Sequence, residues 1–129
     1  MIEVAFLTWN RAKTAIKSLK SLLDEPLVTK IHLFDDCSNE EEWQIIRGAC
    51  LNEDRVIIKR NEQNLGFNRN YFQAMRVLQG SNENYQFLCE SDMLLAKGWG
   101  RQVKKAFDKS QESMVLTPML HMGQLTKNR

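Results

Sequence analysis

The sequence predicts a single α/β domain in which a mainly parallel sheet carries helices on both faces, a three-layer α/β/α arrangement. Three observations support this fold class. Apolar runs of strand length alternate with helix-periodic segments from end to end. No linker, repeat or low-complexity segment interrupts the alternation. The length of 129 residues fits one domain with a real core, so residues 1–129 are treated as a single unit.

Each expected element has a local signal in the sequence. The strands are expected from short apolar runs and the helices from apolar residues at helical spacing. In chain order the expected elements are a strand at 2–8, a helix at 12–23, a strand at 29–34, a helix at 39–51, a strand at 55–59, a helix beginning after Gly66, a strand at 85–89, a helix around 99–107 and a strand at 114–117.

The predicted helices each have one apolar face. Pro26 closes the first helix, because proline cannot continue a helical backbone. The expected inner faces are Ala12, Ala15, Ile16, Leu19, Leu22 and Leu23 in the first helix, Trp43, Ile46 and Cys50 in the second, Phe67, Tyr71, Ala74, Met75 and Leu78 in the third, and Trp99, Val103, Ala106 and Phe107 in the fourth.

Composition narrows the classes of protein to consider. A formal net charge of +2, with Lys and Arg spread along the chain, argues against a nucleic-acid partner. The three cysteines form no CxxC pair and have no zinc-ligand spacing. Their odd number argues against a disulfide framework and favours a reducing, cytoplasmic location. The N-terminus does not read as a signal peptide, and no apolar stretch approaches the roughly 20 residues of a membrane span. We expect no membrane segment.

In open parallel sheets, ligands bind beyond the carboxyl ends of the strands. Polar and acidic residues are concentrated at four such places: Thr8–Arg11, Asp35–Ser38, Arg60–Gly66 and Glu90–Asp92. The last of these is the most informative, because an apolar run ends there in two carboxylates two positions apart. Glu90 and Asp92 could share one hard cation such as Mg²⁺ or Mn²⁺. The alternative is that Asp92 starts a turn and Glu90 is solvated.

The acidic segment after the second strand has both a local and a functional interpretation. Ser38 followed by Glu41 reads as a capping box for the next helix. Two successive acids, Asp35 and Asp36, exceed what one cap needs. A carboxylate at this strand end is well placed to accept hydrogen bonds from a nucleobase or a ribose hydroxyl, a role that we assign to Asp36.

The other two strand ends also leave alternatives open. Trp9 offers a stacking surface for a base, or folds onto the sheet edge, and Asn10 reads as the N-cap of the first helix. Gly66 permits a tight turn at a helix start, where free N–H groups favour phosphate and Arg69 adds a positive fork. The simpler interpretation of this stretch is a loop with an Asn cap and a surface arginine.

Taken together, these stretches resemble the nucleotide-sugar-binding half of family 2 glycosyltransferases, which have the Rossmann-like GT-A fold. Five motifs carry the resemblance, which covers residues 1–118 and leaves 119–129 as a tail. Thr8-Trp9-Asn10-Arg11 is similar to the family's T-Y-N-R, Phe34-Asp35-Asp36-Cys37-Ser38 to V-D-D-G-S, Asn64-Leu65-Gly66-Phe67-Asn68-Arg69-Asn70 to a shortened N-x-G-x-x-x-A-R-N, Phe87 to Asp92 to F-L-D-x-D, and Gly98-Trp99 to a downstream pair.

The resemblance implies a nucleoside diphosphate sugar donor, UDP- or GDP-linked, and transfer of its sugar to a carbohydrate or other hydroxyl acceptor. By position, the donor-binding residues would be Thr8, Trp9, Asn10, Asp36, Asn64, Gly66 and Arg69. Asp92, with Glu90 assisting, would ligate Mn²⁺ or Mg²⁺ in a DxD-like motif in which Glu90 replaces the commoner Asp. The family's second half, with the acceptor site and catalytic base, has no counterpart here, so a partner chain or a missing C-terminal half would supply it.

Two other functions remain open at this point. A non-catalytic nucleotide-sugar-binding or assembly module of the same fold would keep the donor site and lack transfer. A nucleotidyltransferase of similar topology would also use metal and nucleotide. That class normally has a Gly- and Arg-rich loop after the first strand, which Arg11-Ala12-Lys13 does not supply.

Overall fold

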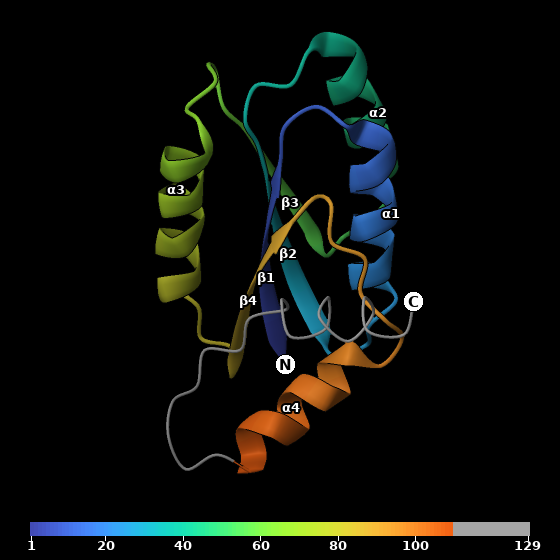
Figure 1. Cartoon of the computed structure of the whole chain (residues 1–129), viewed down its shortest axis with the longest axis vertical. Helices are drawn as coiled ribbons and strands as arrows, with labels where there is room; N and C mark the ends of the chain where they lie inside the picture. Colours follow the sequence, from blue (N-terminus) through green and yellow to red (C-terminus); the bar gives the residue numbers. More distant parts are fainter. Residues whose placement is uncertain (110–129) are drawn as a thin grey trace, which may run out of the picture.

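The computed structural model describes residues 1–109, and strands and helices alternate strictly along them (Figure 1). In chain order the elements are β1 (Ile2–Thr8), α1 (Ala12–Leu23), β2 (Val28–Asp35), α2 (Glu40–Cys50), β3 (Val56–Arg60), α3 (Phe67–Gln79), β4 (Tyr85–Glu90) and α4 (Trp99–Lys109). Every strand and helix expected before residue 109 is present, within two residues of the expected ends wherever both ends were predicted. The strand expected at 114–117 lies outside the described residues.

The described sheet has four strands in the order β3-β2-β1-β4, and every neighbouring pair is parallel. The chain moves outward from β1 through β2 to β3 and then crosses back to place β4 on the other side of β1. Thr8 pairs with Asp35 on β2, and Leu7 pairs with Glu90 on β4. The carboxyl ends of β2, β1 and β4 therefore lie next to one another at one edge of the sheet.

The helices form a layer on each face of the sheet (Figure 1). α1 and α2 cover one face, and α3 covers the other. α4 lies at the end of the sheet where the strands begin, away from their carboxyl ends. β1 is buried along its whole length, and its side chains alternate between the faces, as a strand with period two requires. Ile2, Val4 and Phe6 belong to the core under α1 and α2, whereas Ala5 and Leu7 pack under α3.

The inner face of α3 differs from the expected one. Its buried residues are Asn70, Ala74 and Leu78, spaced four apart, whereas Phe67 is 58% exposed. The prediction of an inward Phe67 is wrong, because the inward position of the first turn belongs to Asn70. The carbonyl oxygen of that amide accepts hydrogen bonds from Asn61 and Gln73, which lowers the cost of a polar residue at a core position.

A polar cluster also lies under α3. His32 lies in β2, with its Nε2 2.5 Å from Oε1 of Glu3 on β1. Ser81 donates a hydrogen bond to the other oxygen of Glu3. Burial alone would raise the pKa of Glu3, but the hydrogen bonds from Ser81 and His32 outweigh it and lower the pKa below the usual 4.5.

Among residues 1–109, no helix has both the length and the apolar character needed to cross a membrane.

Candidate functional site

The four loops singled out in the sequence leave the sheet at its carboxyl edge. The strand order reverses between β1 and β4, so this edge contains the switch point at which open α/β sheets bind ligands. Asp36 follows β2 on one side of β1, and Glu90 and Asp92 end β4 on the other. The loop of residues 61–66 follows β3, farther along the same edge. The fold thus brings all four loops to one edge.

The loop after β1 presents one aromatic side chain to solvent. Thr8 is 2% exposed, and its carbonyl accepts a hydrogen bond from the Asp36 N–H at 2.9 Å. Trp9, by contrast, is 56% exposed and is free to meet a ligand, as the stacking interpretation requires. Asn10 bonds across to the loop after β2: its N–H donates to Ser38 Oγ at 2.7 Å, and its Oδ1 accepts from the Asn39 N–H at 2.9 Å.

The expected helix caps are wrong for both α1 and α2. Arg11, not Asn10, directly precedes α1, in the left-handed conformation with φ 54°. The first N–H of α1, on Ala12, donates to Glu42 Oε2 at 2.5 Å, so a carboxylate from α2 caps α1. Asn39, not Ser38, is the N-cap of α2, with its Oδ1 accepting from the Glu42 N–H at 3.0 Å. The Ser38 hydroxyl is used elsewhere: it accepts from the Asn10 N–H and donates to Asp35.

Asp35 is fully buried and organises the turn after β2. Its Oδ2 accepts from the Ser38 N–H at 3.0 Å, and the Ser38 hydroxyl donates to its Oδ1. Nε of Arg60 lies 3.6 Å from the same Oδ2, and this guanidinium also stacks over Trp43 at 4.9 Å from the ring centre. Asp35 therefore has a structural role in the turn after β2. The two successive acids at this strand end thus have different partners, since Asp36 bonds to the loop after β3.

Asp36 is 4% exposed and binds the loop after β3. Oδ1 accepts from Asn61 Nδ2 at 2.9 Å and from the Leu65 N–H at 2.8 Å. Oδ2 accepts from the Gly66 N–H at 3.0 Å. A carboxylate has about four lone-pair positions, so one position on Oδ2 remains for another donor. The carboxylate is held in place by the chain itself, and its capacity for a ligand is a single hydrogen bond.

The loop before α3 folds tightly around this carboxylate. Asn64 donates to the Asp36 carbonyl at 3.3 Å, and its Oδ1 accepts from the Gly66 N–H at 3.0 Å. Gly66 has φ 79°, a left-handed value that favours glycine, as the expected tight turn requires. The Gly66 N–H is shared between Asn64 and Asp36. Arg69, in the first turn of α3, is exposed.

Glu90 and Asp92 are exposed at the end of β4. The Glu90 carbonyl accepts from the Met93 N–H at 3.1 Å, which closes a turn around Asp92. Within residues 1–109, neither carboxylate has a hydrogen-bond or ion-pair partner, and no group of three His, Cys, Asp or Glu side chains could hold a metal. Two free oxygen-ligand groups suit Mg²⁺ or Mn²⁺, which take one or two carboxylates and complete their shell with water and phosphate.

Cys89 lies directly beneath these two carboxylates and is chemically inert. Burial raises the pKa of its thiol to about 12; a hydrogen bond with Ser18 opposes this rise, and the nearby charges of Asp92 and Glu90 add to it. A thiol that stays protonated is neither a nucleophile nor a metal ligand. The sulfur packs in the core, where Cys89 is 0% exposed.

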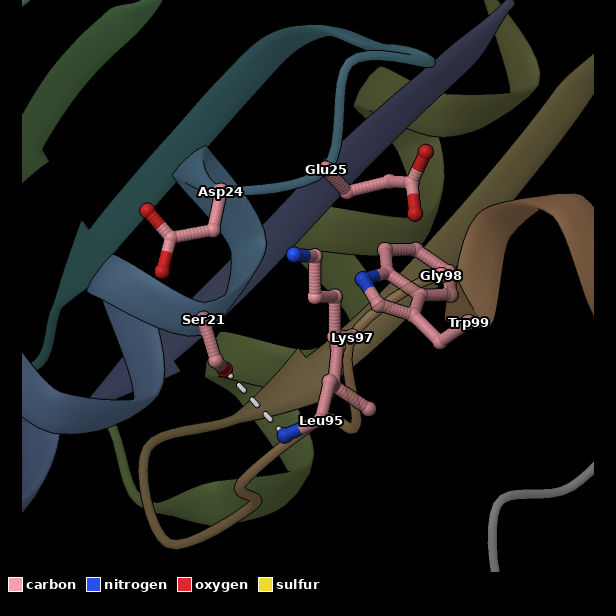
Figure 2. Close-up of a pocket in the computed structure, with 7 residues that line it drawn as sticks. All are labelled: Ser21, Asp24, Glu25, Leu95, Lys97, Gly98 and Trp99. Atoms are coloured by element: carbon pink, nitrogen blue, oxygen red, sulfur yellow. Dashed lines mark hydrogen bonds between the residues drawn. The ribbon is translucent and has the colours of Figure 1, made fainter.

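Two cavities lie elsewhere among the described residues, and neither joins the two acidic loops. One, of about 410 Å³, lies beside Asn61 and Gln73 at the β3 side of the carboxyl edge. The other, of about 390 Å³, lies between the end of α1 and the residues before α4, where Leu95 N–H donates to Ser21 Oγ at 3.1 Å (Figure 2). Asp36 and Asp92 share an edge, and neither residue lines either of these two cavities.

Comparison with known families decides what kind of domain this is. The model of the family described as Glycosyl transferase family 2 matches residues 4–127. The chain belongs to this family. No curated protein sequence matches the chain.

Solved structures agree with a family 2 glycosyltransferase fold. S. aureus TarS in complex with UDP-GlcNAc superposes with a TM-score of 0.68 at 18% identity, over 92% of this chain and 37% of TarS 1-349. A mannosyltransferase from Pyrobaculum calidifontis in complex with GDP-Man and Mn²⁺ gives a TM-score of 0.71 at 14% identity, over 92% of this chain and 36% of that one. The GT-A type of fold is thus confirmed, and the chain spans well under half the length of these proteins.

Proposed function

We propose that this family 2 domain binds a nucleoside diphosphate sugar together with a divalent cation, for transfer of the sugar to an acceptor hydroxyl. The observation that supports the proposal most is the gathering of an exposed Trp9, a fixed Asp36 carboxylate and two free carboxylates, Glu90 and Asp92, at the switch point of a family 2 sheet. The solved relatives that hold UDP-GlcNAc or GDP-Man support this class of donor.

The nucleoside would lie over the β1 and β2 ends. The exposed ring of Trp9 would stack on the base, an interaction worth about 1–3 kcal/mol where it has been measured on single strands. The free lone pair on Asp36 Oδ2 would accept one hydrogen bond from a base N–H or a ribose hydroxyl. Thr8 and Asn10 would shape this end of the pocket, since the Thr8 carbonyl and both the N–H and Oδ1 of Asn10 bond to the loop after β2.

The diphosphate would lie toward the start of α3 and the end of β4. Arg69, exposed in the first turn of α3, would reach the phosphates, and the tight turn at Asn64 and Gly66 would allow close approach of the backbone. Asp92, with Glu90, would hold the cation. When bound, the cation neutralises the charge that builds on the departing nucleoside diphosphate.

Among residues 1–109, no residue is assigned to the acceptor site or to the catalytic base. Further chain or a partner chain would supply them. If neither does, the domain is a binding module without transfer, the alternative left open by the sequence. An assay for donor hydrolysis or sugar transfer separates the two functions, because a module binds donor without turnover.

Calorimetry with UDP and with GDP, each with and without Mn²⁺, tests the donor site. We expect binding that depends on Mn²⁺ in the wild type and that Asp92→Ala abolishes. Asp54→Ala is the matched control, because Asp54 is equally exposed but lies in the turn before β3, at the opposite edge of the sheet. Unchanged nucleotide affinity in Asp92→Ala would refute the metal role, and absence of nucleotide binding in the wild type would refute the donor site.

A further inference from the structure

A cluster of buried side-chain amides lies under the loop of residues 61–66, and the donor site as proposed does not use it. Asn61 is 7% exposed and Asn70 is 4% exposed, yet both polar atoms of the Asn61 amide are paired and Asn70 Oδ1 accepts two hydrogen bonds. Amides at such depth are costly unless every polar atom is paired. Asn70 lies on the inner face of α3, where Phe67 was expected. Two buried amides at this place need a structural or functional reason.

Asn61 is the centre of this cluster. Its Nδ2 donates to Asp36 Oδ1 at 2.9 Å and to Asn70 Oδ1 at 3.1 Å. Its Oδ1 accepts from Gln73 Nε2 at 2.9 Å, and the same Nε2 donates to Asn70 Oδ1 at 2.5 Å. The Asn61 N–H bonds to the Asp35 carbonyl at 2.8 Å. One side chain thus joins the end of β2, the loop after β3 and the inner face of α3.

These bonds determine how the Asp36 carboxylate is turned. With Oδ1 fixed by Asn61 and Leu65, and Oδ2 held by Gly66, rotation about the carboxyl group would break at least one bond. The free lone pair of Oδ2 therefore has one direction. Buried polar networks that are fully satisfied are rigid, because any partly broken arrangement leaves an unpaired group at low dielectric.

We propose that Asn61 is a positioning residue for the donor: its amide, aligned by Gln73 and Asn70, fixes both the Asp36 carboxylate and the Leu65–Gly66 turn against which the nucleotide binds. The proposal rests on the proposed function and deepens it, since Asn61 itself need not touch the nucleotide. The affinity for the nucleotide would then depend on the buried amide of Asn61, which does not itself contact the nucleotide.

The charged groups around the cluster are few, which makes an added charge easy to interpret. Asp36 is the carboxylate in direct contact. Lys59 Nζ donates to Gln73 Oε1 at 2.9 Å, on the outer side of the cluster. Arg60 points away, toward Asp35 and Glu40. Glu62 is exposed in the loop itself.

Asn61→Asp tests the proposal with almost no change of shape. The substitution replaces Asn61 Nδ2, which donates to Asp36 Oδ1, by a carboxylate oxygen. Two carboxylates at hydrogen-bond distance either repel each other or share a proton. We expect nucleotide affinity in the presence of Mn²⁺ to be at least about tenfold weaker than wild type near pH 8, because the fixed carboxylate is lost. The deficit should narrow toward about pH 5.5, as a shared proton restores the bond.

Gln63→Glu is the matched control, because it adds the same charge in the same loop at an exposed side chain outside the cluster. At each pH, the nucleotide affinity of Gln63→Glu should be within about threefold of wild type, because exposed charges are screened. The ratio of the two affinities should not change on acidification. An Asn61→Asp protein whose affinity and pH profile match those of Gln63→Glu would overturn the proposal.

Amide hydrogen exchange at Leu65 and Gly66 provides a readout that does not need the nucleotide. Both N–H groups donate to Asp36, so their protection factors should fall in Asn61→Asp near pH 8 and stay unchanged in Gln63→Glu. If the wild type binds no nucleotide, the proposed function fails, and exchange alone decides whether Asn61 positions the turn. Equal protection of these amides in Asn61→Asp and Gln63→Glu would overturn the proposal that Asn61 positions the Leu65–Gly66 turn.

A milder variant keeps the test decisive if Asn61→Asp does not fold. Gln73→Ala removes the donor that aligns Asn61 Oδ1 and adds no charge. We expect affinity to fall about threefold, with native-like melting and lower protection at Gly66. Wild-type affinity and wild-type protection in Gln73→Ala would overturn the proposal.

Discussion

Gly100 is the position where a small substitution tests the packing of α4 most directly. Glu25, which is 4% exposed, accepts the Gly100 N–H with Oε2 at 3.1 Å and the Leu27 N–H with Oε1 at 3.2 Å. A Cβ at residue 100 would lie 2.7 Å from Glu25 Cδ and 2.8 Å from Cγ. No real Cβ contact is that short, so Gly100→Ala must displace the side chain that caps α4.

The cost follows from the bonds that Glu25 would give up. A hydrogen bond to a charged group contributes about 1.5–3 kcal/mol, and moving the carboxylate weakens at least one of two such bonds. Replacing glycine by alanine in a helix returns at most about 1 kcal/mol. We therefore expect Gly100→Ala to lower the free energy of unfolding by about 1–2 kcal/mol, or the melting temperature by about 4–8 °C.

Denaturant unfolding of Gly100→Ala beside Gly48→Ala is the assay. Gly48 lies inside α2 with no atom within 4 Å of its would-be Cβ, so the same substitution there should stabilise by about 0.5–1 kcal/mol. In a Glu25→Ala background the cost at Gly100 should vanish, since the colliding side chain is absent. Stabilisation by Gly100→Ala in the wild-type background would refute the reasoning, because Glu25 would not then lie against α4.

Three further predictions concern the sheet and its core. The folded pKa of Glu3 is below 4.5, so its contribution to stability is complete above about pH 4.5 and is lost as the pH falls through the folded value. The difference in unfolding free energy between wild type and Glu3→Gln should therefore shrink on acidification; a constant difference would contradict this. Cys37, half-buried, should react with a thiol reagent in the native protein, whereas Cys89 should react only on unfolding; rapid native labelling of Cys89 would show that the sheet opens. Phe6→Ala, at 0% exposure, should cost about 3–5 kcal/mol in chemical denaturation, and Phe72→Ala, at 65% exposure, less than about 0.5, a contrast that equal costs would exclude.

The sequence predicts the elements well because their signals are local. The apolar run of β1 and the helical spacing of α1 are read from neighbouring residues, and both elements have the expected bounds. The family resemblance is confirmed for the same reason, since each motif is a short stretch at a strand end or a helix start. The parallel sheet follows from the alternation itself.

The connections between loops could not be read in this way. Asn10 has the residue type of an N-cap, yet it bonds to Ser38 and Asn39, which lie 28 and 29 residues away in the sequence. Asp36 was assigned to a ligand, and three of its lone-pair positions bind donors 25 to 30 residues farther on. Choosing between a local cap and a distant partner requires the fold, because one side chain can serve either.

The buried amides show the limit of an apolar pattern. Asn70 stands four residues before Ala74 and eight before Leu78, so its place on the inner face was visible from spacing. The expected face was built from apolar residues alone, so it named Phe67 and did not include Asn70. The paired amides overturn this choice, since a hydrogen-bonded Asn is tolerated in a core where an unpaired one is not. The ligand roles of Trp9, Asn64, Arg69, Glu90 and Asp92 stay predictions.

The position of β1 between β2 and β4 has a consequence for how the protein is made. β1 leaves the ribosome well before its partner β4, which begins only at Tyr85. At ordinary rates of synthesis, on the order of ten seconds separate the two strands. During that interval one side of the most apolar strand is unpaired, so nascent chains stalled before Tyr85 should aggregate or recruit chaperones far more readily than chains stalled after Glu90.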